Sequence, residues 1–392
     1  GTVVHVLDAS RAVGVMAEAI SRESALSTKV SAQYAELRQR HTDRSITLVP
    51  LHRARTEGAQ VSAHIPAEPK HLGRHVLEPT LTQVSELIDW TPFFTAWEMR
   101  GSYPQILNDP RQGAQATELF ADGQAMLARM LDDGRIYARG VVSLWPAHRE
   151  GDDIVIDIGL EPDPTDPTTD PKTEPTTDKR ADARRGDAES AHNGQPVFHT
   201  LRQQRERRSG GYTALADFVA PRGDHLGGFA VAIHGAEELA GEFRDAADDY
   251  SAIMVQVLAD RLAEAFAEWA HREVRTRLWG YAEGEDLPIE DVIKERYPGI
   301  RPAPGYPAQP DHTEKQTLFN LLDANAVGMH LTESFAMTPN SAVAGMYFGH
   351  PDSTYFSLGK MARDQVQDYA MRKNWSLADA EKWLSPNLGY QP

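Results

Sequence analysis

A long helical pattern in the third quarter of the chain limits what the sequence can fold into. Large apolar residues recur there at spacings of three and four, which places their side chains on one face of an α-helix. They are Met254, Leu258, Leu262, Phe266 and Trp269. We predict one helix from about residue 248 to residue 278. A helix of this length needs a broad apolar surface to cover its buried face, so it should be the spine of the fold.

The segments around this helix mix helices and strands without a regular repeat. Helices are predicted at residues 81–87, 114–131, 313–322 and 360–371, and strands at 136–145, 153–158 and 343–348. Residues 313–316 fit a capping box, and the pairs Gly210-Gly211 and Gly227-Gly228 are predicted to be turns. This order indicates an α+β fold, with a mixed or antiparallel sheet and flanking helices.

Two segments differ in character from the rest of the chain. Residues 1–45 begin with a β-branched run and a helix for which Ser10 is a suitable N-cap. One strand and two helices do not make a domain, so we expect them to be the C-terminal remnant of a Rossmann-like α/β domain, and residues 46–392 to be a second domain. Residues 161–194 are rich in Pro, Thr and acidic side chains, which predicts a disordered insertion.

Composition excludes several classes of function. The chain has 57 acidic and 40 basic side chains, a formal net charge of −17, and no cysteine. The negative charge argues against a nucleic-acid partner, and the lack of cysteine excludes thiolate metal sites and iron–sulfur clusters. No apolar run is long enough to span a membrane. We therefore expect a cytoplasmic monomer that accommodates a cationic small ligand more readily than a nucleic acid.

The most unusual stretch is a proline-rich segment at residues 301–312. Its prolines fix φ and lack a backbone donor, so it is neither helix nor central strand, and Gly305 permits an unusual turn. As a ligand cradle it would offer the planar guanidinium of Arg301 to a carboxylate and the ring of Tyr306 to a flat group. As a connector it would simply lead to the next helix, and composition alone favours the connector.

Other candidate residues have two readings each. Asp89 lies among aromatic residues, where it is either a paired acid or the N-cap of a helix. Glu264 lies on the polar stripe of the long helix with Arg261, Glu268 and His271, and such a stripe is usually a solvated face. Asp89 and Glu264 could also form a glycosidase pair. Tyr355 and Phe356 either stack on a planar ring or belong to the core.

A metal site would have to be assembled from scattered residues. The candidates are His312, His330 and His350 with Asp311 and Glu314, but no metal-binding spacing links them. We therefore predict no metal site. A stand-alone metal-dependent hydrolase stays open as an alternative function. No phosphate-binding loop, dinucleotide fingerprint or serine-nucleophile motif is present in the sequence.

Seven blocks of sequence resemble the C-terminal activation region of cobalamin-dependent methionine synthases. They are residues 88–94, 201–204, 216–221, 259–266, 301–315, 331–337 and 386–390. In addition, residues 3–13 look like the last strand and helix of that family's cobalamin-binding domain. The resemblance covers the chain from about residue 46 to its end. It departs from the family at Gln309, where a cysteine is frequent, and at Phe356, where a second tyrosine is frequent.

The resemblance implies an S-adenosylmethionine-binding domain that repairs its enzyme. Such a domain presents a methyl group for reductive methylation of cob(II)alamin, and a flavodoxin-like reductase supplies the electron. By carry-over, Arg301 would hold the ligand carboxylate, and Asp89 and Glu264 would meet its positive groups. Gly305 would allow close backbone approach. The ligand would also be lined by Tyr306, Tyr355 and Phe356, and Ala9 would touch the corrin.

The same resemblance limits what the chain does alone. It implies a methyltransferase that passes a methyl group from 5-methyltetrahydrofolate to homocysteine, of which this chain is the reactivation part. Zinc and the homocysteine site would belong to another module, and the cobalamin-binding domain would be a partner in the same polypeptide. The isolated part is not expected to turn over. A module that senses the ligand without presenting its methyl group is a further alternative.

Overall fold

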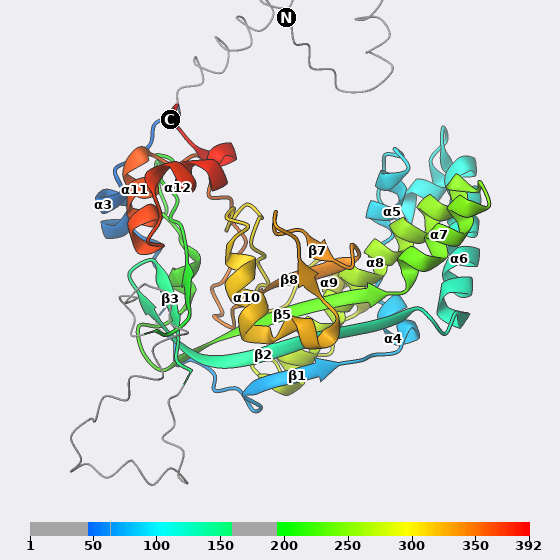
Figure 1. Cartoon of the computed structure of the whole chain (residues 1–392), viewed down its shortest axis with the longest axis horizontal. Coiled ribbons are helices and arrows are strands. Elements are labelled where there is room, and N and C mark those ends of the chain that lie inside the picture. The colour runs from blue at the N-terminus through cyan, green and yellow to red at the C-terminus, as the bar shows by residue number, and fades with distance from the viewer. Residues whose placement is uncertain (1–45, 63, 159–193) are drawn as a thin grey trace, which may run out of the picture. The chain divides into compact units, whose positions relative to one another are not determined.

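The computed structural model describes residues 46–62, 64–158 and 194–392 (Figure 1). The expected remnant of a cobalamin-binding domain at residues 1–45, with Ala9, lies outside these ranges, as do residues 161–193 of the expected insertion. The chain divides between Leu48 and Val49, and the unit Val49–Pro392 is described below.

In the described part of the chain, six strands form an antiparallel sheet in the order β4-β3-β2-β5-β8, and β1 also pairs with β2. The strands are β1 (Gly73–Leu77), β2 (Tyr137–Glu150), β3 (Asp153–Ile156), β4 (Val197–His199), β5 (Asp224–His234) and β8 (Ala342–Tyr347). A separate hairpin joins β6 (His330–Leu331) and β7 (Met337–Thr338). Strand β2 is 14 residues long, so one edge pairs with β1 and then with β3.

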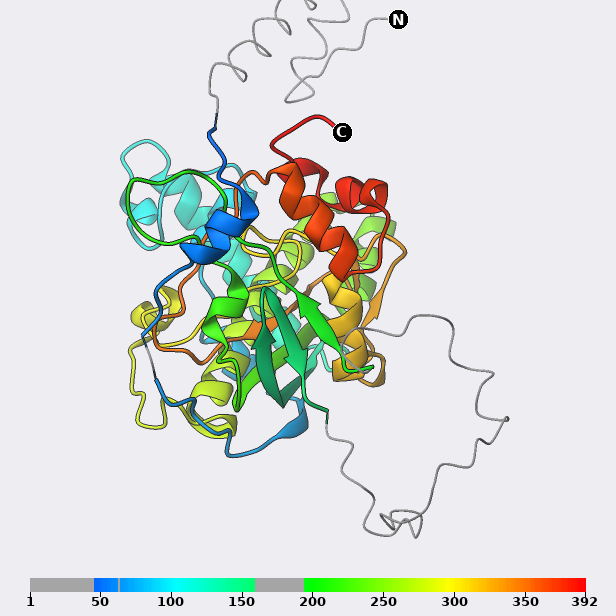
Figure 2. The same cartoon turned by 90° about the vertical axis from the view of Figure 1, so that its left-hand side faces the viewer.

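Helices cover both faces and both ends of this sheet (Figures 1 and 2). They are α3 (Leu51–Thr56), α4 (Leu81–Ser85), α5 (Thr91–Ala96), α6 (Gly113–Asp132), α7 (Ala236–Asp245), α8 (Asp249–Glu273), α9 (Ile289–Ile293), α10 (Glu314–Leu322), α11 (Arg363–Arg372) and α12 (Leu377–Trp383). None of these helices is both long enough and apolar enough to cross a lipid bilayer. The predicted α+β fold of antiparallel sheet and flanking helices is confirmed.

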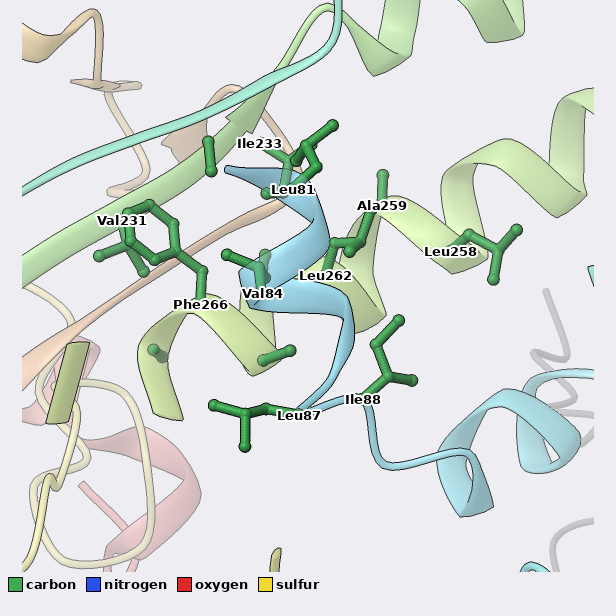
Figure 3. Close-up of a cluster of buried hydrophobic side chains, with 14 of the residues drawn as sticks. Leu81, Val84, Leu87, Ile88, Val231, Ile233, Leu258, Ala259, Leu262 and Phe266 are labelled. Carbon is green, nitrogen blue, oxygen red and sulfur yellow. The ribbon is translucent and has the colours of Figure 1, made fainter. Parts of the chain in front are cut away.

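The core has two layers because β5 is apolar on both of its faces. Phe229, Val231 and Ile233 belong to the cluster that contains the buried face of α8 (Figure 3). The alternate residues Ala230 and Ala232 belong to the cluster that contains α10. Successive side chains of a strand point to opposite faces, so a central strand with helices on both sides must be apolar throughout.

The long helix is the spine of the fold, as predicted. Helix α8 continues into a π-helical turn at Val274–Leu278, so the helical segment ends at the predicted residue 278. The prediction that its polar stripe is solvated is wrong for two of the four residues. Glu268 is 5% exposed and His271 is fully buried. Charged groups from later in the chain cover this part of the helix, which helical periodicity alone does not reveal.

Two further local predictions are wrong because tertiary contacts override local signals. Gly227 and Gly228 lie inside β5 rather than in a turn, and a Cβ atom at Gly228 would lie 2.7 Å from both Leu318 and Trp145. No capping box opens α10. The Thr313 hydroxyl donates to Asp311 at 2.9 Å instead of capping the helix.

Candidate functional site

A cavity of about 530 Å³ lies beside β8, where the proline-rich segment meets α8 and the residues that follow β8. This volume is typical of small-molecule sites, which range over roughly 300–1,000 Å³. The residues that line it are Phe229, Glu264, Glu295, Arg301, Pro302, Ala303, Pro304, Tyr306, Pro307, Ala308, Lys315, Met337, Ala342, Val343, Ala344, Tyr355, Phe356 and Ser357. Most are apolar, with two carboxylates, a guanidinium and an ammonium among them.

The proline-rich segment forms this wall because it begins as an addition to the sheet edge. Ile300 and Phe348 bond to each other through their backbones, and the N–H of Met346 donates to the Pro302 carbonyl at 2.9 Å. The preceding residue, Gly345, is close to the same carbonyl group, and a Cβ atom on Gly345 would be 2.8 Å from the Pro302 oxygen. As predicted, the segment is neither a helix nor a central strand, and it is a cavity wall as well as a connector.

Gly305 forms the turn for which the sequence singled it out. Its φ is +94°, and its N–H donates to the Gln309 carbonyl at 2.7 Å. A Cβ atom at this position would be 2.3 Å from the ring of His312. Backbone conformation and close packing therefore both require glycine. The turn holds Tyr306 against the cavity with 61% of its surface exposed.

Arg301 is held in place by two carboxylates and a phenol. Its guanidinium is 2.8 Å from Glu268 and 3.3 Å from Glu295, and it donates to the Tyr297 hydroxyl. Burial alone would lower the pKa of Arg301, but Glu268 and the neighbouring Tyr297, Tyr355 and Glu295 together outweigh it, and the pKa is raised. Arg301 is therefore a permanent cation with a fixed plane at the cavity wall.

A second arginine lies deeper in the same network. Arg275 is fully buried, its guanidinium lies 3.6 Å from the centre of the Tyr297 ring, and it forms two hydrogen bonds with Glu285 at 2.8 and 2.7 Å. Glu268 is 3.6 Å from Arg275. Burial raises the pKa of Glu268 although both arginines oppose the shift. Glu268 thus pairs with Arg301 at the cavity wall and with Arg275 in the buried interior.

The structure brings together most of the residues that the resemblance implied. Glu264, Arg301, Tyr306, Tyr355 and Phe356 all line the one cavity. They come from three segments that are far apart in the sequence, and Gly305 shapes the loop between two of the lining residues.

Asp89 is placed differently from these residues. It is half-buried at the junction of α4 and α5, and its carboxylate accepts a hydrogen bond from the Thr91 N–H at 2.9 Å. This hydrogen bond to the first residue of α5 resembles the helix-capping role that was one of the two interpretations of Asp89. It is not among the residues that line the cavity.

Sequence reasoning missed four residues of the site. Glu295 and Lys315 line the cavity, and Glu268 and Tyr297 support Arg301 from behind. One signal was available for Glu268, because it follows Glu264 by one helical turn and therefore lies on the same side of α8. Nothing in the sequence links the other three residues to Arg301.

Several resembling blocks serve stability at a distance from the cavity. Arg202 is buried and bonds Asp152 at 2.6 Å and Asp217 at 2.7 Å, which joins the second and third blocks. Gln309, one of the departures, donates to the His199 carbonyl at 2.7 Å and does not line the cavity. Its exchange for cysteine therefore affects the packing against β4.

The histidines considered for a metal lie apart in different surroundings. His312 accepts from Lys315, His330 bonds Asn325 at 2.8 Å, and the ring of His350 lies 4.1 Å from that of His64. Across the described ranges, no three His, Asp or Glu side chains are grouped so that they could hold a metal ion. Asp311 and Glu314 instead bond Lys373.

Fold and cavity together define a small-molecule-binding domain whose site offers both signs of charge on apolar walls. The chain belongs to the family described as "Vitamin B12 dependent methionine synthase, activation domain", whose model matches residues 80–374. It is also similar to a chain in the crystal structure of the MetH reactivation domain bound to AdoHcy, with 43% sequence identity and a TM-score of 0.77. That match covers 88% of this chain and 99% of the other. The resemblance inferred from the sequence is confirmed.

Proposed function

We propose that this domain binds S-adenosylmethionine in the cavity beside β8 and presents its methyl group for the reactivation of cobalamin-dependent methionine synthase. Family membership supports the reactivation role. The similar structure contains AdoHcy, S-adenosylhomocysteine, which is what remains of S-adenosylmethionine after the methyl group has left. The observation that carries the proposal is the meeting of Arg301 with Glu264 and Glu295 in one ligand-sized cavity.

The charges of the cavity complement those of the ligand. S-adenosylmethionine has a carboxylate, an ammonium and a sulfonium cation near one end, and a neutral nucleoside at the other. Arg301 offers its guanidinium to the carboxylate, while Glu264 and Glu295 attract the two cations. The prolines and the rings of Tyr306, Tyr355 and Phe356 supply apolar surface. Asp89 stays in the proposal through the resemblance alone.

In this proposal the chain binds and orients, and its partners supply the rest of the chemistry. Cobalamin, carried by a neighbouring domain where Ala9 would touch the corrin, supplies the cobalt that accepts the methyl group. A flavodoxin-like reductase supplies one electron. The residues of this chain hold the sulfonium so that its methyl group faces outward, and S-adenosylhomocysteine is left in the cavity. The isolated domain then binds the ligand without turnover.

Calorimetric titration of S-adenosylmethionine tests the ligand assignment. We expect Arg301→Ala to weaken binding at least tenfold, because hydrogen bonds between charged groups contribute about 1.5–3 kcal/mol. Arg296→Ala is the matched control, since Arg296 lies on the surface and pairs with Asp291. Equal affinity of wild type and Arg301→Ala overturns the site, and no binding by folded wild-type protein overturns the ligand.

A second experiment separates methyl presentation from mere sensing. Cobalamin that has been reduced chemically is mixed with S-adenosylmethionine, with and without this protein, and its methylation is followed by absorbance. Faster methylation with wild type than with Arg301→Ala supports presentation. Equal rates with and without the protein would leave only a ligand-sensing role.

A further inference from the structure

Lys315 is a buried cation without an anionic partner. It is 8% exposed and lines the cavity. Its ammonium donates to His312 Nδ1 at 3.0 Å and to the Phe335 carbonyl at 3.1 Å, and both acceptors are neutral or carry only partial charge. In the part of the chain that the structure describes, no carboxylate lies within ion-pair distance of it. An ammonium has three donors, so one is left over.

The start of α10 explains how a lysine comes to this position. Asp311 and Glu314 are three residues apart, and both bond Lys373 on the side toward α11. His312 and Lys315 are also three residues apart and bond each other. The two pairs are offset by one residue, so they face different sides of the turn. Asp311 and Glu314 are therefore paired with Lys373, and Lys315 faces the cavity without a carboxylate beside it.

The two cations of the cavity thus differ in kind. The charge of Arg301 is matched by Glu268 and Glu295. The charge of Lys315 is not matched, and burial lowers its pKa. An unpaired buried charge is costly to a folded protein. The presence of such a residue in a binding cavity is explained if a bound ligand supplies the missing hydrogen-bond acceptor.

We propose that Lys315 is a ligand-binding residue that donates a hydrogen bond to a neutral acceptor on the purine or ribose of the bound nucleoside. The uncompensated ammonium repels the sulfonium and ammonium groups of the ligand, which Glu264 and Glu295 attract. The single carboxylate of the ligand is assigned to Arg301. The neutral nucleoside is the remaining part, so Lys315 marks the nucleoside end and sets the direction of the ligand in the cavity.

This inference rests on the proposed function, and a pair of ligands tests the two separately. S-adenosylhomocysteine contains both ends of the ligand, whereas 5′-methylthioadenosine contains the nucleoside but no amino acid. Calorimetry, with competition for the weaker ligand, gives the affinity of each. We expect Lys315→Met to weaken both by a similar factor of about tenfold, since one hydrogen bond to a charged group is lost. Arg301→Ala should weaken S-adenosylhomocysteine alone.

Two further variants keep the result interpretable. Lys315→Gln retains a donor without the charge, and we expect it to bind both ligands more tightly than Lys315→Met because the acceptor is neutral. Lys382→Met removes an exposed lysine that lies over the Trp383 ring, and it should bind like wild type. Melting curves of all the variants show whether a loss of binding reflects unfolding.

The outcomes distinguish the two claims. If folded wild type binds neither ligand, the proposed function fails and this inference fails with it. If wild type binds both and Lys315→Met binds them equally well, only this inference is overturned. It is also overturned if the loss is confined to S-adenosylhomocysteine, since Lys315 would then contact the amino-acid end. Wild type that binds S-adenosylhomocysteine but not methylthioadenosine counts against it too, because a nucleoside anchor should hold the nucleoside alone.

Discussion

Replacing Glu268 tests whether the network behind the cavity holds the domain together. Glu268 is 5% exposed, and its carboxylate lies 2.8 Å from Arg301 and 3.6 Å from Arg275. It also accepts from the Tyr297 hydroxyl at 2.9 Å. Glu268→Ala removes all three interactions and leaves two buried guanidinium groups with less negative charge around them.

The expected magnitude follows from the burial of the pair. Breaking a buried ion pair by removing one partner costs about 3–5 kcal/mol, because the other charge stays buried and uncompensated. Arg301 and Arg275 retain Glu295 and Glu285, so we expect the low end, about 3 kcal/mol. Glu268→Gln keeps the shape and one acceptor and should lose less. Glu264→Ala, one turn earlier and exposed, should change stability by no more than about 0.5 kcal/mol.

Urea denaturation followed by tryptophan fluorescence and by circular dichroism measures these differences. A shift of the urea midpoint for Glu268→Ala, without a change of slope, reports a change of stability. A free energy of unfolding for Glu268→Ala that equals that of Glu264→Ala would refute the reasoning. In that case the contacts of Glu268 would not contribute to stability, and Arg301 would need another explanation for its position.

Two further predictions concern the cavity wall and acid stability. Gly305→Ala should weaken S-adenosylmethionine binding in calorimetry without unfolding the protein, because φ is +94° and the added Cβ would press on His312; unchanged affinity would contradict this. Lys373 holds the pKa of Asp311 below its usual value, although burial opposes this. That stabilisation is present above about pH 4 and is lost as the pH falls through the lowered pKa of Asp311. Asp311→Asn has no carboxyl group to protonate at this position. Its urea midpoint should therefore fall less steeply below about pH 4 than the urea midpoint of wild type. Parallel curves would contradict it.

Local pattern predicted five of the ten α-helices and three of the eight strands in the described part of the chain, among them the long helices α6 and α8, because apolar spacing reports directly which face of an element is buried. The helix through Met254 and Leu258 and the strand at β8 were found in this way. The exceptions are positions where a distant segment supplies the partner. Gly228 lies in a strand because β5 pairs there with both β2 and β8, and the side chains of Leu318 and Trp145 leave no room for a Cβ atom. Thr313 occupies the N-cap position of α10, but its hydroxyl donates to Asp311 and does not cap the helix.

The candidate site was predictable only in part. Arg301, Gly305 and Tyr306 could be singled out because a proline-rich segment is conspicuous in the sequence. Glu264 and Tyr355 were candidates with two interpretations each until the resemblance assigned them to the ligand, and the structure places them at the same cavity. Glu268 had only its spacing of one helical turn from Glu264 as a signal, and Tyr297 and Lys315 had none, since a buried polar or charged side chain looks like a solvated one until its neighbours are known.

The sequence by itself determined the long helix α8, the family and the irregular conformation of the proline-rich segment. These follow from the side-chain spacing along α8, from blocks of matching residues, and from backbone restrictions at Gly305 and its neighbouring prolines. Only the tertiary structure decided which charges are paired. It matched Arg301 with Glu268 and left Lys315 facing the cavity without an acid. The physical reason is that the energy of a charge depends on its burial and on neighbours within a few ångströms, and folding brings these from distant parts of the chain.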